Sequence, residues 1–202
     1  MIVTQIIPVT KSRSRIWIDG EPAFVLYKGE LHLYHLAEQR EITREDYDRI
    51  MTEILPKRAK LRAMNLLKNK DYTEEELRRK LINGEYPEKI IIQALEYVAS
   101  YGYLDDLKYA EAYISDNEKR KSPKMIENNL LKKGIRKDVI EKAWDRWRAK
   151  GGETDEREMI EELLRKRRYD PKNAELKEKQ RTYAFLLRKG FSADLIMDVL
   201  HD

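Results

Sequence analysis

The sequence has no cysteine, only 8 glycines and 6 prolines among 202 residues, and no long apolar run. The lack of cysteine excludes disulfides, thiol nucleophiles and thiolate zinc sites, and it fits a reducing compartment. No segment approaches the roughly 20 apolar residues that span a bilayer, and the N-terminus lacks the layout of a signal peptide. We therefore expect a cytoplasmic protein with no membrane contact.

Charged residues are abundant instead. They make up 39% of the chain against 41% hydrophobic residues, a balance typical of a helix-rich soluble protein. Residues 1–56 hold 7 basic and 9 acidic residues, whereas residues 57–202 hold 34 and 28. The second part would therefore meet a polyanion or an acidic partner. A net charge of +4 is too small to define a nucleic-acid binder by itself.

The N-terminal segment has the alternating β-branched and aromatic residues of a small sheet. Asp19-Gly20 is a strong hairpin signal. Three strands bury little alone, so we expect cover from residues 30–37 and from a helix capped by Thr43, which Pro56 would interrupt. The expected strands lie near residues 2–9, 14–18 and 22–27.

From residue 57 onward the periodicity is helical and repeats three times. The segments "KLINGEYPEKII", "LLKKGIRKDVIEKA" and "LLRKGFSADLIMDVL" each place a Leu three residues before a Gly and an Ile six residues after it. This spacing indicates a helix ended by a left-handed glycine and followed at once by a new helix. The repeated residues are Leu81, Gly84 and Ile90; Leu131, Gly134 and Ile140; Leu187, Gly190 and Ile196.

Caps complete each repeat. Thr73 with Glu76 reads as a capping box, Ser122-Pro123 as a cap followed by an N-terminal proline, and Ser192 as the cap of the last helix. The leading helices are expected at about 58–69, 106–120 and 155–168.

The predicted fold is mainly α, with three tandem three-helix repeats forming an elongated, curved body. A small three-stranded N-terminal domain with one or two helices precedes them. The predicted domains are residues 1–56, 57–102, 103–150 and 151–202.

The stretch "SYGYLDDLKYAEAYISDNEKRKSP" raises the question of catalysis, because Asp105 and Asp106 are adjacent. Neighbouring residues at a helix start point in different directions, and no further ligand lies at a metal-binding spacing. We interpret Gly102 as the end of one helix and Asp105 as the cap of the next. His32 and His35 share a helix face but lack a third ligand. The sequence predicts no catalytic residue, no metal site and no cofactor.

Trp144 and Trp147 could stack on bases, but with Ile140 and Ala143 they make the apolar stripe of a buried helix. We expect at least one of them in the core. Basic clusters recur near helix ends, where cations are favourable.

Three motifs in order resemble the RecX family, bacterial regulators of the RecA recombinase. They are "GYLDD", "KSPKMIENNLLKKGI" and "RRYDPKNAELKEKQRTYAFLLRKGFSADLI", and "IWIDGEPAF" is similar to an N-terminal extension of many Gram-positive members. The resemblance covers about residues 57–202. One departure is Lys121-Ser122-Pro123, where the family usually has Lys-Gly, so a contact that needs a close backbone approach by glycine is in doubt.

The resemblance implies a non-enzymatic protein that lies in the groove of the RecA nucleoprotein filament, slows ATP hydrolysis and strand exchange, and so regulates DNA repair. It also implies contact with single- and double-stranded DNA, and we expect a monomer. The runner-up is a helical DNA-binding protein that acts alone, marked by salt-dependent DNA binding without RecA. The candidate contact residues are Arg120, Lys121, Lys124, Lys132, Lys133, Arg165, Arg167, Arg168, Arg188 and Lys189.

Overall fold

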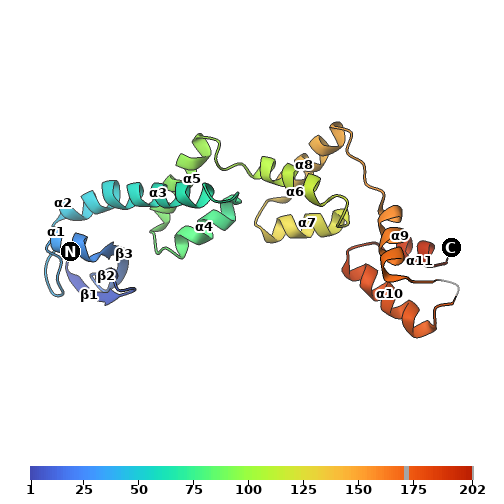
Figure 1. The fold of residues 1–202 in the computed structure, drawn as a ribbon. Helices are drawn as coiled ribbons and strands as arrows, with labels where there is room; N and C mark the ends of the chain where they lie inside the picture. The colour runs from blue at the N-terminus through green and yellow to red at the C-terminus, as the bar shows by residue number, and fades with distance from the viewer. Residues whose placement is uncertain (171–172, 202) are drawn as a thin grey trace. The chain divides into compact units, whose positions relative to one another are not determined.

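The computed structural model describes residues 1–170 and 173–201. It divides into two compact units, Met1–Asp105 and Asp106–Asp202 (Figure 1). None of the helices in the described residues is both long and apolar enough to cross a membrane.

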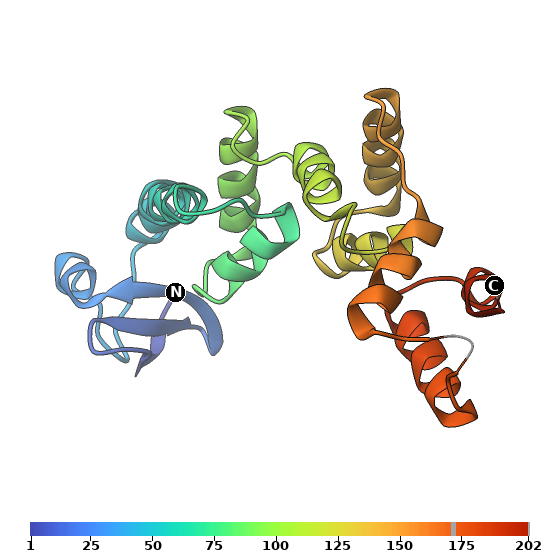
Figure 2. The ribbon, with the colours of Figure 1, turned by 45° about the vertical axis from the view of Figure 1, so that its right-hand side comes forward.

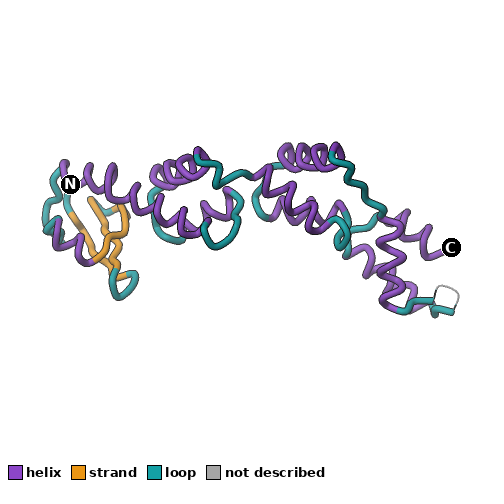
Figure 3. The backbone as a smooth tube through the Cα atoms, turned by 45° about the horizontal axis from the view of Figure 1, so that its top comes forward, coloured by secondary structure: helices purple, strands orange, loops and turns teal. Residues whose placement is uncertain are grey.

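A three-stranded antiparallel sheet, orange in Figure 3, opens the first unit. Its strands are β1 (Val3–Pro8), β2 (Arg13–Ile18) and β3 (Glu21–Tyr27), in the order β1-β2-β3. Asp19 and Gly20 join β2 to β3 with φ of 50° and 89°, as a two-residue type I′ turn requires. Ser14, Ile16 and Ile18 of β2 are buried in alternation, because strand side chains have a period of two. The predicted strands and their turn are confirmed.

A continuous helical run follows the sheet, and here the prediction for Pro56 is wrong. Thr43 caps the run as predicted, its Oγ1 accepting from the Asp46 amide at 3.1 Å. Pro56 does not interrupt it, because the Leu55 amide bonds to the Ile50 carbonyl in a wider π turn, and Pro56 then falls in the first turn of the next helix. The run consists of α2 (Arg44–Arg49), the π-helical turn η1 (Ile50–Ile54) and α3 (Leu55–Leu67). The short helix α1 (Lys28–Leu33) lies before it and is separate.

The first three-helix repeat consists of α3, α4 (Glu74–Ile82) and α5 (Glu88–Ser100), and the green helices α4 and α5 lie side by side in Figure 2. The predicted capping box is present: Thr73 accepts from the Glu76 amide, and the Glu76 side chain accepts from the Thr73 amide. The sheet and this repeat share one core, in which Leu26 of β3 and Leu81 of α4 are both fully buried.

The expected left-handed glycine of the first repeat is a second correction. Glu85, not Gly84, has the positive φ, at 61°. Gly84 is required for another reason, since a Cβ there would lie 2.8 Å from the Tyr86 ring and 3.1 Å from the Leu81 carbonyl oxygen. The Glu85 side chain pairs with Arg15 of β2 and so ties the first repeat to the sheet.

Two further three-helix repeats, each with its own buried cluster, make up the second unit. Gly134 and Gly190 have φ of 86° and 91°, which confirms the predicted left-handed ends. Ser122 and Ser192 cap the helices predicted for them, accepting from amides at 3.3 Å. The helices are α6 (Asp106–Asn117), α7 (Pro123–Lys132), α8 (Lys137–Ala149), α9 (Glu156–Arg167), α10 (Leu176–Arg188) and α11 (Ala193–His201).

Helix α6 ends at Asn117, three residues before the expected position, so Arg120 and Lys121 lie in the turn that leads to α7. The mainly α fold, with three three-helix repeats behind a three-stranded sheet, is confirmed.

Candidate partner-binding surface

All ten predicted contact residues lie in the second unit, at helix ends or in the turns that join helices. Seven of them are exposed and form no ion pair or side-chain hydrogen bond with any described residue. These seven are Arg120, Lys124, Lys132, Arg165, Arg167, Arg168 and Arg188.

Other cations of the same unit are neutralised locally. The Glu111 carboxylate forms ion pairs with Arg146, at 3.1 Å, and with Lys150, at 2.6 Å. The hydrogen bond from Lys150 is the main cause that lowers the pKa of Glu111. Neighbouring carboxylates likewise pair with Arg136, Lys137, Arg148, Arg157 and Lys166. None of these paired cations is among the seven exposed residues named above, so those seven keep positive charge available for a partner.

Two of the predicted lysines lie over a pair of stacked tyrosines on α6. The Tyr109 and Tyr113 ring centroids are 6.5 Å apart with planes 10° from parallel. Lys121 Nζ donates to the Tyr113 hydroxyl at 2.8 Å and lies 4.9 Å from that ring's centroid, while Lys133 Nζ lies 5.3 Å from the Tyr109 centroid. Lys121 has no ion-pair partner among the described residues, so its cation–π contact orients it without cancelling its charge.

Phe185 of α10 orients two more predicted cations in the third repeat. The Arg167 guanidinium carbon lies 4.3 Å from the ring centroid, and Lys189 Nζ lies 5.6 Å from it. Arg168, the next residue, ends α9 in the left-handed conformation with φ of 53°. One aromatic ring, that of Phe185, therefore orients a cation at the end of α9 and another at the end of α10.

Ser122 connects the second and third repeats. Besides capping α7, its hydroxyl donates to the Lys189 carbonyl at 2.8 Å. The adjacent Gly190 fits closely, since a Cβ there would lie 2.5 Å from Ser122 Oγ and 3.3 Å from Met125 Cβ. The departure from the Lys-Gly pattern therefore places a buried serine at this joint, and the close approach is made by Gly190 of the third repeat.

The joint brings together predicted residues that are far apart in sequence. The turn with Arg120 and Lys121 meets the end of α10, which carries Arg188 and Lys189. Lys132 lies at the other end of α7, about 15 Å along that helix at 1.5 Å per residue. Arg120, Lys121, Arg188 and Lys189 therefore gather near Ser122, whereas Lys132 and Lys133 lie at the C-terminal end of α7.

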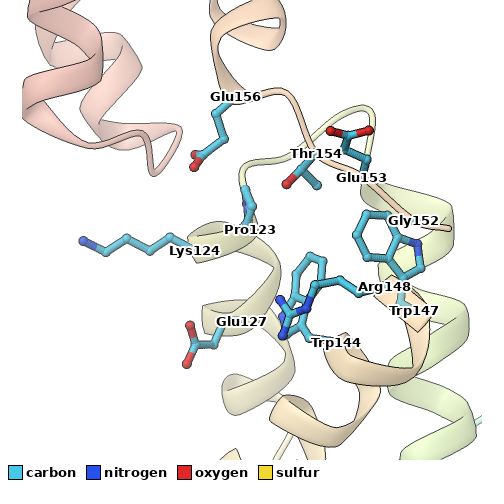
Figure 4. Close-up of a pocket in the computed structure, with 10 residues that line it drawn as sticks. All are labelled: Pro123, Lys124, Glu127, Trp144, Trp147, Arg148, Gly152, Glu153, Thr154 and Glu156. Atoms are coloured by element: carbon cyan, nitrogen blue, oxygen red, sulfur yellow. The ribbon is translucent and has the colours of Figure 1, made fainter. Parts of the chain in front are cut away.

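A hollow of about 720 Å³ lies between α7, α8 and the start of α9 (Figure 4). Trp147 is 7% exposed and donates from Nε1 to Glu118, which confirms that one of the two tryptophans belongs to the core. The backbone at Gly152 packs against the Trp147 ring, since a Cβ at residue 152 would lie 2.3 Å from atoms of that ring. Lys124, at the rim, extends away from both tryptophans. Glu156 also lines the hollow, and its burial raises the pKa of its carboxyl group.

Among the described residues, no group of three or more His, Asp or Glu side chains is placed to hold a metal ion. Asp106 begins α6, in line with an architectural role for the acidic pair. The arrangement is suited to binding an anionic or acidic partner through oriented cations.

Sequence reasoning missed the aromatic residues that orient the cations. Tyr109 and Tyr113 are four residues apart on α6, a spacing that places them on one helix face and could have indicated the pair. Phe185 gave no comparable signal, because its contact with Arg167 joins two helices.

Comparison with known proteins gives a consistent result. Three family profiles match, described as the first, second and third three-helix domains of RecX, over residues 59–97, 105–143 and 153–200. A "Regulatory protein RecX" of Caldanaerobacter subterraneus subsp. tengcongensis is 30% identical over 100% of this chain and 99% of its own. One from Clostridium acetobutylicum is 29% identical over 95% and 90%, respectively.

Solved structures are similar as well. A crystal structure of regulatory protein RecX has a TM-score of 0.63 and 25% identity, covering 100% of this chain and 99% of its own. A RecX from Lactobacillus salivarius has a TM-score of 0.57 and 25% identity, covering 73% and 96%. Because the repeats, their order and the near full-length relatives agree, the chain belongs to the RecX family.

Proposed function

We propose that this protein is a non-enzymatic regulator of the RecA recombinase, which binds as a monomer in the groove of the RecA–DNA filament in the cytoplasm. There it slows ATP hydrolysis and strand exchange and so regulates DNA repair. The observation that carries the proposal is a set of exposed cations in the second unit, in a chain of the RecX family. None of these cations has an ion-pair partner among the residues that the structure describes.

Charge supports this proposal, because a filament built on nucleic acid is polyanionic. Cations that are not neutralised within the protein can replace counterions on phosphates or meet acidic side chains in a groove. Lys121, Arg167 and Lys189 are also oriented by aromatic rings, so less side-chain freedom is lost when a partner binds.

A regulator needs no chemistry of its own to slow a motor. If it binds one conformation of the filament more tightly than the next, each turnover must overcome that difference in binding free energy. The family resemblance supplies RecA as the partner, and the charged surface supplies a physical means of contact.

The proposal is tested by titrating RecA's single-stranded-DNA-dependent ATPase with the protein and with the double variant R120E/K124E. Arg120 lies in a turn, and Lys124 lies in the first turn of α7, where a glutamate is favoured by the helix dipole. The fold should therefore be retained. The reversed charges should raise the concentration needed for half-maximal inhibition by about tenfold or more, because like charges then face the partner.

The double variant R136E/K137E is a matched control. It changes the net charge equally and also places a glutamate at the start of a helix, but both of its cations already have ion-pair partners. Its titration should stay close to that of the unchanged protein. Equal effects of the two variants would remove Arg120 and Lys124 from the contact surface, and unchanged hydrolysis with the natural sequence would overturn the proposed function.

A further inference from the structure

The first unit carries an exposed row of tyrosines at the end of α5. Tyr97 and Tyr101 have ring centroids 5.0 Å apart, and the Tyr101 and Tyr103 rings are stacked at 6.2 Å with planes 18° from parallel. Tyr101 is 61% exposed and Tyr103 is 58% exposed. Tyr97 packs against the core, whereas Tyr101 and Tyr103 contribute little to it, although all three rings are ordered against one another.

Helix α3 supplies positive charge beside this row. Residues 55–70 contain six cations and no carboxylate. Lys60 Nζ lies 4.8 Å from the Tyr97 centroid, and Lys57 and Lys68 are exposed without an ion-pair partner among the described residues. Arg58 is the exception, because it pairs with Glu30.

Two hollows connect the lysines to the tyrosines. One, of about 380 Å³, is lined by Lys57, Lys60 and Tyr97, and the other, of about 470 Å³, is lined by Lys68 and Tyr103. Met64 lines both hollows, so they are neighbours along α3. Their carboxylates are few: Glu53, which is paired with Arg49, and Asp71.

From this arrangement we propose that the α3–α5 face of the first unit binds single-stranded nucleic acid, with unpaired bases stacking on Tyr101 and Tyr103 and phosphates passing along Lys57, Lys60 and Lys68. Lysines beside an aromatic row match the two requirements of single-strand binding, which are a π face for the base and a cation for the backbone. Duplex nucleic acid meets only the second requirement, because its bases are already stacked.

An acidic protein segment is the main alternative occupant of this face. It would use the same lysines, but it would not require exposed rings ordered side by side, which are suited to planar groups. The occupants differ in one measurable property, since only nucleic acid binding depends on the presence of bases.

The test measures the affinity of the full chain, without RecA, for a short oligo-thymidylate and for an abasic oligomer of equal length. Both carry the same phosphate charge, so any cations elsewhere on the chain contribute equally. The natural sequence should bind oligo-thymidylate about tenfold or more tightly, and Y101A/Y103A should lose this preference. Y101F/Y103F, which keeps both rings, should retain it.

A second readout isolates the lysines. K57A/K68A should keep the preference for bases but reduce the slope of log affinity against log salt by about 1.4, at roughly 0.7 per phosphate contact on a single strand. Equal affinities of the natural sequence for the two oligomers, or a full preference in Y101A/Y103A, would overturn the proposal and favour a protein occupant. Because RecA is absent, neither result depends on the proposed regulation of the filament.

Discussion

Replacing Trp147 by alanine is expected to lower the free energy of unfolding of the second unit by about 3–5 kcal/mol, the usual cost of removing a buried tryptophan. The side chain is 7% exposed and meets Trp144 edge to face at 5.3 Å. Its Nε1 donates to Glu118 at 2.6 Å. The alanine variant would lose the packing and leave Glu118 without its donor.

Trp144→Ala is the matched comparison, because this tryptophan is on the same helix but only partly buried. It should cost about half as much or less, since less apolar surface leaves water on folding. Urea unfolding followed by circular dichroism measures both, and amide hydrogen exchange in α6–α8 locates the effect. Equal losses for the two variants would show that Trp147 is not the anchor of this core.

Gly190→Ala is expected to destabilise the second unit by about 2–4 kcal/mol. A left-handed φ of 91° disfavours any side chain by roughly 1 kcal/mol relative to glycine, and overpacking typically adds 1–3 kcal/mol. The added Cβ would lie 2.5 Å from Ser122 Oγ. The contact between the second and third repeats must therefore shift.

Gly151→Ala separates the two causes in the same unit. Gly151 has a similar φ of 86°, but an added Cβ there meets nothing within 4 Å, so only the conformational cost of about 1 kcal/mol applies. The double variant S122A/G190A should lose less stability than the two single variants combined, because it removes the clashing oxygen. Additive losses, measured by thermal unfolding, would contradict a direct contact between Ser122 and residue 190.

Local signals accounted for most of the secondary structure. The Asp19-Gly20 turn, the Thr73 capping box and the Ser122 cap each involve residues only a few positions apart, so the sequence pattern contains the whole interaction. Where prediction failed, another part of the chain was involved. Glu85 takes the left-handed position in the first repeat while its side chain pairs with Arg15, 70 residues away.

No sequence pattern indicated the π turn before Pro56. Proline is expected to interrupt a helix only where the helix is a regular α-helix, and the π turn removes that condition.

The candidate surface was predictable in composition but not in arrangement. Clusters of Lys and Arg mark where charge lies, and all ten residues fall at helix ends or turns as the repeats indicated. Whether a cation is available to a partner depends on whether a carboxylate folds beside it. Glu111, for example, pairs with Arg146 and Lys150, which are 35 and 39 residues away in the sequence. The Ser122–Lys189 bond spans 67 residues and could not be read from spacing.

The order of the buried clusters along the chain has a consequence for biosynthesis. The first cluster is complete at Leu104, and the next begins at Ala110, with no sharing of residues between them. A nascent chain can therefore close the sheet and the first repeat as soon as Leu104 leaves the ribosome, before α6 has been made. Each later repeat then emerges with enough apolar residues to form its own buried cluster. Apolar surface of the nascent chain is therefore exposed to aggregation for a shorter time.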